Sequence, residues 1–109
     1  MDKTIELKTP ITALGATYTK VIKTAYEHAG GPTALVLKTS DNDPKYDIII
    51  TVNIPPLTNQ TVIAINVNSP TVDEILPLLI ENKLIGEQIG SIPSGWVLFP
   101  IFKIGEAVK

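Results

Sequence analysis

Few side chains in this sequence have the type and spacing that acid–base or nucleophilic chemistry needs. His28 is the only histidine and cysteine is absent, which excludes a thiolate nucleophile, a histidine metal pair and a thiolate zinc site. A base at His28 would need a hydroxyl beside it, yet Ser91 and Ser94 lie in a stretch without the pattern of an activated serine. His28 is therefore interpreted as an exposed turn residue, and we predict no catalytic residue and no enzyme activity.

Three carboxylates, Asp41, Asp43 and Asp47, resemble the start of a calcium-binding loop. Pro44 interrupts the pattern, no central glycine follows, and no glutamate closes a loop of the required length. Asp and Asn also bend the chain by binding their own backbone. We interpret residues 40–45 as a turn and predict no metal site.

Neither group of glycines has the spacing of a phosphate-binding loop. Gly30 and Gly31 lack the later glycine, the lysine and the helix start that such a loop requires. Gly86, Gly90 and Gly95 are too widely spaced for a dinucleotide-binding motif. The first pair is predicted to form a turn, and no cofactor is predicted.

All nine basic residues are lysine, and the net charge is −2. Arginine is the usual bidentate reader of guanine and of phosphate, so its absence, with a mildly acidic balance, argues against nucleic acid as a partner. The N-terminal residues carry charges of both signs, unlike a secretory signal. No apolar run approaches the roughly 18 residues of a membrane span. We expect a cytoplasmic protein that does not bind a membrane.

Alternating apolar and polar residues predict strands along most of the chain. Residues 12–28 leave two alternatives open, because Val21, Ile22 and Ala25 have near-helical spacing, whereas the many threonines favour a strand; we prefer the strand. The first strand is expected to end at Pro10. The predicted strands cover residues 5–7, 17–26, 33–39, 46–54, 61–67 and 96–104, and residues 86–95 are predicted to form a loop.

One helix is predicted near residues 70–83. Thr71 and Glu74 have the spacing of a capping box, and an apolar stripe follows at helical spacing. Pro77 is expected to kink the helix or to end its regular part. The expected fold is a single α+β domain over residues 1–109. It has a mainly antiparallel sheet of five or six strands, with the helix packed on one face before the last strand.

The last predicted strand holds the only tryptophan, Trp96, and both phenylalanines, Phe99 and Phe102. It is apolar on both faces, which indicates a strand covered on both sides. Pro100 cannot donate a ladder hydrogen bond, so an edge position is predicted for this strand. The two faces carry Trp96, Leu98, Pro100, Phe102 and Ile104 on one side, and Val97, Phe99, Ile101 and Lys103 on the other.

Two interpretations of this aromatic segment stay open. In the first, the aromatic side chains pack in the core, as is usual in small domains. In the second, one face, with Val97, Phe99 and Ile101 as the candidate, is exposed and binds a partner, because aromatic side chains often anchor interfaces. Tyr18, Tyr26 and Tyr46 would then extend the patch. The candidate partner-binding residues are Trp96, Val97, Phe99, Ile101 and Phe102.

The second half of the chain resembles a small family of phage and mobile-element proteins of Gram-positive bacteria, a domain of unknown function. The resemblance covers residues 46–104 and rests on the order of "ITVNIP", "AINVNSP", "EILPLLIENKL" and "PSGWVLFPIFKI". It implies a short sheet protein with one helix before the last strand. It also implies an accessory gene of a mobile element, and it supplies no catalytic residues.

These observations favour a non-enzymatic protein that binds a host or phage protein, with inhibition of a host defence or regulatory protein as one instance. Two alternatives stay open. One is a self-associating structural phage protein in which residues 96–104 form a homodimer seam. The other is a protein that binds a small ligand or nucleotide between tyrosines, lysines and the loop 86–95.

Overall fold

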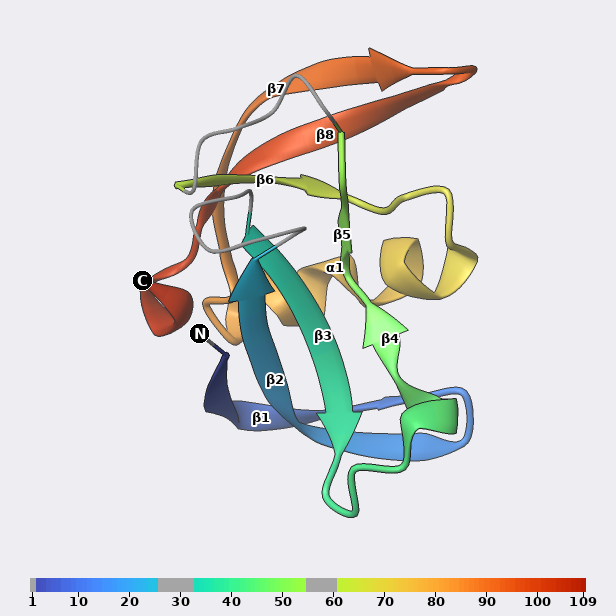
Figure 1. Ribbon diagram of the computed structural model, residues 1–109, viewed down its shortest axis with the longest axis vertical. Helices are drawn as coiled ribbons and strands as arrows, with labels where there is room; N and C mark the ends of the chain where they lie inside the picture. Colours follow the sequence, from blue (N-terminus) through green and yellow to red (C-terminus); the bar gives the residue numbers. More distant parts are fainter. Residues whose placement is uncertain (1, 26–32, 55–60) are drawn as a thin grey trace.

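The computed structural model describes residues 2–25, 33–54 and 61–109. Within them the chain forms two four-stranded antiparallel sheets and one α-helix (Figure 1). The first sheet has the order β1-β2-β3-β4. Its strands are β1 (Lys3–Ala13), β2 (Ala16–Ala25), β3 (Thr33–Thr39) and β4 (Ile48–Ile49).

The second sheet has the strand order β5-β6-β8-β7. Figure 1 shows the first sheet in the lower half of the molecule, the second sheet in the upper half and the helix α1 at mid-height. The remaining elements are β5 (Thr51–Val52), β6 (Val62–Ile65), α1 (Pro70–Glu81), β7 (Ile85–Ser94), β8 (Val97–Ile104) and two 3-10 turns, η1 (Pro44–Tyr46) and η2 (Glu106–Val108).

The α+β class, the mainly antiparallel pairing and the helix are confirmed, but the single sheet of five or six strands is wrong. The segment predicted as one strand over residues 46–54 is divided: β4 pairs with β3 in the first sheet, and β5 pairs with β6 in the second. Its alternation survives in the burial of Ile48, Ile50 and Ile54. Periodicity marks the buried face of an extended segment but does not say which strand pairs with it.

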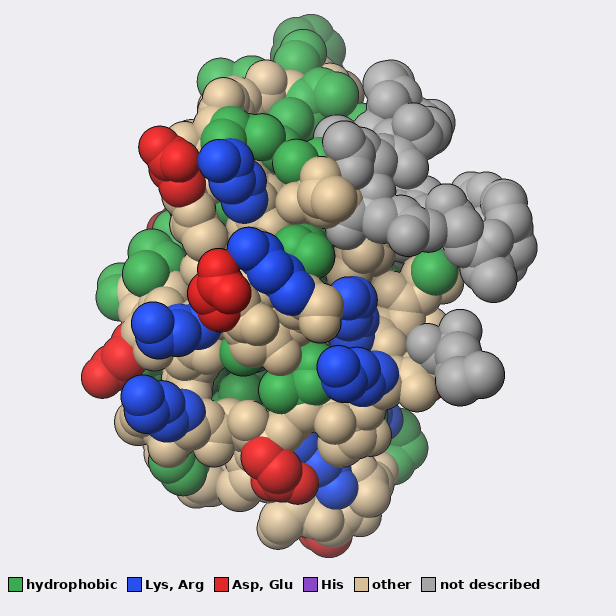
Figure 2. Space-filling view, turned by 90° about the vertical axis from the view of Figure 1, so that its left-hand side faces the viewer, with side chains coloured by type: hydrophobic (Ala, Val, Ile, Leu, Met, Phe, Trp, Pro, Cys, Tyr) green, Lys and Arg blue, Asp and Glu red, His purple; other side chains and the backbone are tan. Residues whose placement is uncertain are grey.

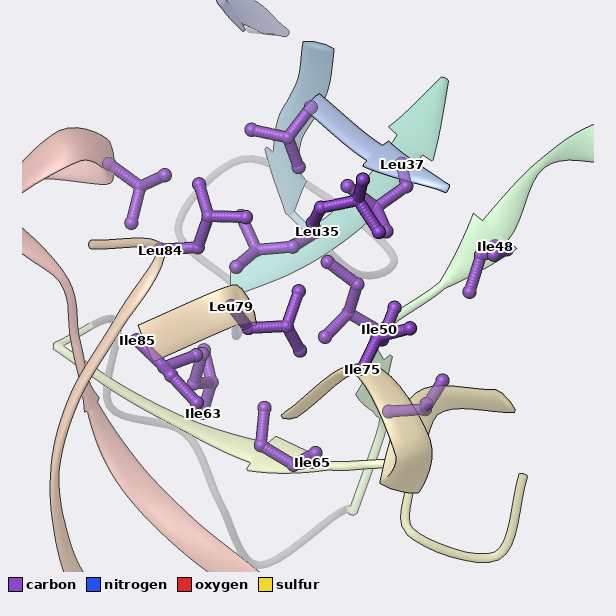
Figure 3. Close-up of a cluster of buried hydrophobic side chains, with 14 of the residues drawn as sticks. Leu35, Leu37, Ile48, Ile50, Ile63, Ile65, Ile75, Leu79, Leu84 and Ile85 are labelled. Atoms are coloured by element: carbon purple, nitrogen blue, oxygen red, sulfur yellow. The ribbon is translucent and has the colours of Figure 1, made fainter. Parts of the chain in front are cut away.

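A core of leucine, isoleucine and valine joins the two sheets and the helix. Figure 3 shows side chains of β3, β6 and α1 pointing toward one another, among them Leu35, Ile63 and Leu79, all buried. This main core comprises Ile11, Tyr18, Val21, Leu35, Leu37, Ile48, Ile50, Ile63, Ile65, Val72, Ile75, Leu79, Leu84, Ile85, Phe102 and Val108.

The N-terminal strands differ from the prediction in one respect. The preferred strand is confirmed over Ala16–Ala25, but the first strand continues through Pro10. The register explains this: Glu6 lies opposite Lys20 and Ile11 opposite Tyr18, so β1 has extra residues between the two pairs. Pro10 lies in this interruption, where no ladder hydrogen bond is needed from it. Tyr26, His28 and the Gly30–Gly31 turn lie outside the described residues.

The helix begins at Pro70, two residues before the start that the predicted capping box implies. Ser69 is the N-cap, and its hydroxyl accepts a hydrogen bond from the Val72 N–H at 3.5 Å. The box of Thr71 and Glu74 is therefore wrong. Proline is favoured at the first helical position, where its missing N–H has no partner to lose. Pro77 does not end the helix, which continues to Glu81.

Asn82 joins the end of α1 to the irregular part of β1. Its side chain is 3% exposed. Its Nδ2 donates to the Leu78 carbonyl at 3.0 Å, and its Oδ1 accepts from the Thr9 N–H at 2.8 Å. The amide side chain thus satisfies one backbone group on each of the two elements.

We expect Asn82→Ala to lower the free energy of unfolding by about 1–3 kcal/mol, because it leaves the Thr9 N–H and the Leu78 carbonyl without this partner. Urea denaturation followed by circular dichroism measures the loss. Asn68→Ala is the control: Asn68 is exposed and its replacement should change stability by less than about 0.5 kcal/mol. Equal stabilities of the two variants would contradict the role of Asn82.

Candidate functional site

Strands β7 and β8 form a long hairpin that projects from the upper end of the molecule (Figure 1). The hairpin closes at the pair Ser94 and Val97, so its loop has two residues, Gly95 and Trp96. Gly95 has φ +60°, and glycine at the first central position is typical of the type II′ turn that suits a two-residue hairpin. This geometry places Trp96 at the very end of the hairpin.

The prediction of a loop over residues 86–95 was therefore wrong. Strand β7 contains two irregular steps: Ile85 lies opposite Ile104, Gln88 opposite Phe102, and Gly90 opposite Ile101. Each step adds one residue to β7 relative to β8, as in a β-bulge. The bulges break the two-residue alternation by which strands are recognised in a sequence, and the glycines weaken the signal further.

Strand β8 is internal, so the edge position predicted from Pro100 is also wrong. Residues Val62–Ala64 of β6 pair with Ile101–Lys103 on one side of β8, and β7 pairs on the other. Pro100 lies opposite Ser91 of β7, just beyond the stretch that β6 pairs. Its missing N–H therefore does not interrupt that ladder.

The two phenylalanines belong to the interior. Phe102 is 5% exposed, lies opposite Ile63 and is part of the main core. Phe99 is 7% exposed and belongs to a second, smaller cluster with Ile54 and Ala64 on the opposite face of the sheet. Each face of β8 thus contributes to one cluster, and the core-packing interpretation is correct for both phenylalanines.

The other candidate residues lie nearer the surface. Val97 and Ile101 are half-buried, and Val97 packs against the second cluster. Trp96 is fully exposed, and Leu98, which the sequence placed on the same face as Trp96, is 62% exposed. Pro93 lies opposite Leu98 and is also exposed. We call Pro93, Trp96 and Leu98 the hairpin tip.

The hairpin tip is apolar and free of charge. Residues 88–102 include no acidic or basic side chain. The nearest ion pair at the base of the hairpin joins the Lys103 Nζ to the Glu87 Oε2 at 3.7 Å. Binding at the tip would therefore rest on the burial of apolar surface.

The face that the sequence offered as exposed, with Val97, Phe99 and Ile101, is buried or half-buried. Trp96 was named among the partner-binding residues, but Leu98 was missed. A recognisable signal was present: Gly95 and Trp96 separate two apolar runs by two residues, the spacing of a tight hairpin. With the hairpin recognised, Trp96 falls in the turn and Leu98 near it, while Phe102 falls toward the body of the protein.

The aspartates of residues 41–47 stabilise local structure. The Asp41 carboxylate accepts a hydrogen bond from the Thr39 hydroxyl at 2.6 Å, which holds the pKa of Asp41 below its usual value. Asp43 accepts from the Lys45 N–H at the start of η1, and Asp47 pairs with Lys38 at 2.8 Å. Among the described residues, no three acidic or histidine side chains are grouped to hold a metal ion.

The tyrosines do not extend the hairpin tip. Tyr18 is buried in the main core, and its hydroxyl donates to the Tyr46 carbonyl at 2.5 Å. Burial is the main cause that raises the pKa of Tyr18, and the nearby Asp47 carboxylate adds to it. Both tyrosines support the first sheet, because this bond fixes η1 against β2.

Comparisons with known proteins found no match among family models, curated proteins or solved structures. The resemblance of residues 46–104 to phage and mobile-element proteins stays a prediction. In the described part of the chain, no helix combines the length and the hydropathy that crossing a membrane requires.

Proposed function

We propose that this chain is a non-enzymatic binding protein that inserts its hairpin tip into an apolar pocket of a larger protein. The observation that carries the proposal is the full exposure of Trp96 at the end of a hairpin without charged side chains. Tryptophan has a large apolar surface, is seldom left uncovered, and is enriched among residues that dominate the energy of interfaces.

The way the hairpin is held supports this mechanism. Phe99 and Phe102 pack on opposite faces of β8, in the second cluster and in the main core. The base of the hairpin is thus fixed from both sides, and the tip extends beyond it. A tip that is already ordered loses less conformational entropy on binding. Burying Trp96 and Leu98 would contribute on the order of 1.5–3 kcal/mol each.

The partner in this proposal is a host or phage protein. The resemblance of residues 46–104 motivates that choice, and inhibition of a host defence or regulatory protein is the instance we favour. The uncharged tip suits a target pocket that is itself apolar, because a charged pocket would be desolvated without compensation.

Self-association is the second candidate, favoured by the same exposed tip. A seam formed by strand pairing along β8 would be confined to residues 97–100, because β7 flanks the strand on one side and β6 pairs with Ile101–Lys103 on the other. The edge strand β7 carries Pro93 and two bulges, features that limit edge-to-edge pairing. A dimer through this hairpin would therefore use the tip and the residues of β8 next to it.

Affinity capture from a lysate of a Gram-positive host tests the proposal. We expect Trp96→Ser and Leu98→Ser each to release a protein that the wild type retains, with a loss of about 2 kcal/mol or more, roughly thirtyfold, at the tryptophan. Leu14→Ser is the matched control, because Leu14 is 64% exposed at the β1–β2 turn.

Two results would oppose the proposal. Capture of the same proteins by the wild type and by Trp96→Ser would show that the tip does not bind them. A dimer in light scattering that Trp96→Ser converts to a monomer would favour self-association instead. Thermal melting checks that Trp96→Ser, Leu98→Ser and Leu14→Ser remain folded.

A further inference from the structure

Two adjoining hollows lie beside the C-terminal end of the described chain, away from the hairpin tip. The larger has a volume of about 490 Å³ and is lined by Thr61, Val62, Ile89, Lys103, Ile104 and Lys109. The smaller, about 390 Å³, shares the last three of these residues and adds the charged side chains of Lys83, Glu87 and Glu106. Together they form one groove with an apolar part and a charged part.

Two of the three apolar residues that line the larger hollow are not part of the core. Val62 and Ile89 belong to neither of the two core clusters. Ile89 is the extra residue of the bulge between Gln88 and Gly90, and it is 49% exposed. A bulge redirects a side chain, and bulges are frequent beside binding sites. Here the bulge places an isoleucine on the wall of the larger hollow.

The lysines around the groove form ion pairs at the exposed surface. The Lys103 Nζ lies 3.7 Å from Glu87, and the Lys109 Nζ lies 2.9 Å from Glu106. All four side chains are more than half exposed, and exposed pairs of this kind are weak. With Lys83, the smaller hollow has three ammonium groups against two carboxylates, although the whole chain is acidic.

The face that carries this groove combines both kinds of surface. Figure 2 shows lysine side chains spread over the face below a hydrophobic area. Lys103, Ile104 and Lys109 line both hollows, so the ammonium groups stand where the apolar and charged parts meet. The methylene stems of the lysines add to the apolar wall while their charged ends stay in water.

We propose that this groove binds one carboxylate with an unbranched acyl chain. The chain lies in the larger hollow against Val62, Ile89 and Ile104, and the carboxylate pairs with Lys103 and Lys109. The volume of the larger hollow is within the range of about 300–1,000 Å³ typical of small-molecule sites. A neutral apolar ligand would form no ion pair with the ammonium groups. A nucleotide would have no aromatic ring to stack on among the described lining residues. The site does not depend on the tip.

Isothermal titration of the full chain with dodecanoate, below the concentration at which it forms micelles, tests the site. We expect saturable binding of one dodecanoate per chain, and binding of the uncharged dodecanol that is weaker by at least about tenfold. Ile89→Glu should abolish dodecanoate binding, because it places a carboxylate in the acyl hollow. Ile80→Glu is the matched control: Ile80 is also 49% exposed, on α1 outside the groove.

Two further variants assign the head group and the place of the chain. Lys103→Gln should weaken dodecanoate binding by about tenfold, while Lys8→Gln, at an exposed lysine of β1, should not. Trp96→Ser should bind dodecanoate as the wild type does. The proposal is overturned by non-saturable titration, by dodecanol binding as tightly as dodecanoate, by normal affinity in Ile89→Glu, or by loss of binding in Trp96→Ser.

Discussion

Phe99→Asp is expected to unfold the protein, whereas Trp96→Asp is expected to leave it folded. Phe99 lies in the second cluster with Ile54 and Ala64 and is 7% exposed. Removing such a phenylalanine costs about 3–5 kcal/mol, and an unpaired carboxylate in its place adds a further penalty. The total approaches the whole stability of a domain of this size, about 5–15 kcal/mol.

Urea denaturation followed by far-ultraviolet circular dichroism measures this difference. Trp96 is fully exposed in the folded protein, so its replacement should change the free energy of unfolding by less than about 0.5 kcal/mol. Its fluorescence should also be of little use as a probe of unfolding, since its surroundings are aqueous in both states. A folded Phe99→Asp variant of wild-type stability would show that the second cluster is not a core.

The contrast between these neighbouring residues shows what could be predicted from the sequence. Concentration of the scarce aromatic residues in one segment identified the right region. The choice between core and interaction surface required the tertiary structure. Phe99 and Phe102 lie on opposite faces of β8, and each face packs in a different hydrophobic cluster. A single strand pattern does not contain that information.

Regular periodicity predicted some elements well. Strand β3 buries Leu35 and Leu37 in alternation, and the α1 stripe of Val72, Ile75 and Leu79 is buried as expected. Strand β2 was predicted despite a register shift between Tyr18 and Lys20. The segment 46–54 also alternates, yet it passes from one sheet to the other. Pairing partners are distant in sequence, so local periodicity cannot assign them.

The groove beside the C-terminal end was beyond sequence analysis for the same reason. Its apolar wall joins Val62 of β6 with Ile89 and Ile104 of the hairpin. In the sequence Ile89 stands among glycines and polar residues, where it gives no sign of facing a hollow. The register shift that turns it there exists only once β7 pairs with β8.

Gly105→Ala is expected to be among the most destabilising single-methyl additions in the described chain. A Cβ at this position would lie 1.9 Å from the Lys83 carbonyl oxygen and 2.4 Å from its carbon. Both are backbone atoms, held in place because the Gly105 N–H donates to the Leu84 carbonyl and the Ala107 N–H to the Lys83 carbonyl, each at 3.0 Å. The φ of Gly105 is −77°, so the need is for space and not for an unusual conformation.

Relieving this contact would separate the end of β8 from the segment that follows α1, and we expect a loss of about 3 kcal/mol or more. Gly90→Ala is the matched control in the neighbouring strand, because no heavy atom lies within 4 Å of its added Cβ and its φ is not positive. That variant should be neutral or gain up to about 1 kcal/mol, since alanine restricts the unfolded chain. Urea midpoints compare the two, and similar midpoints would mean that the two backbones do not approach as closely as the structure places them.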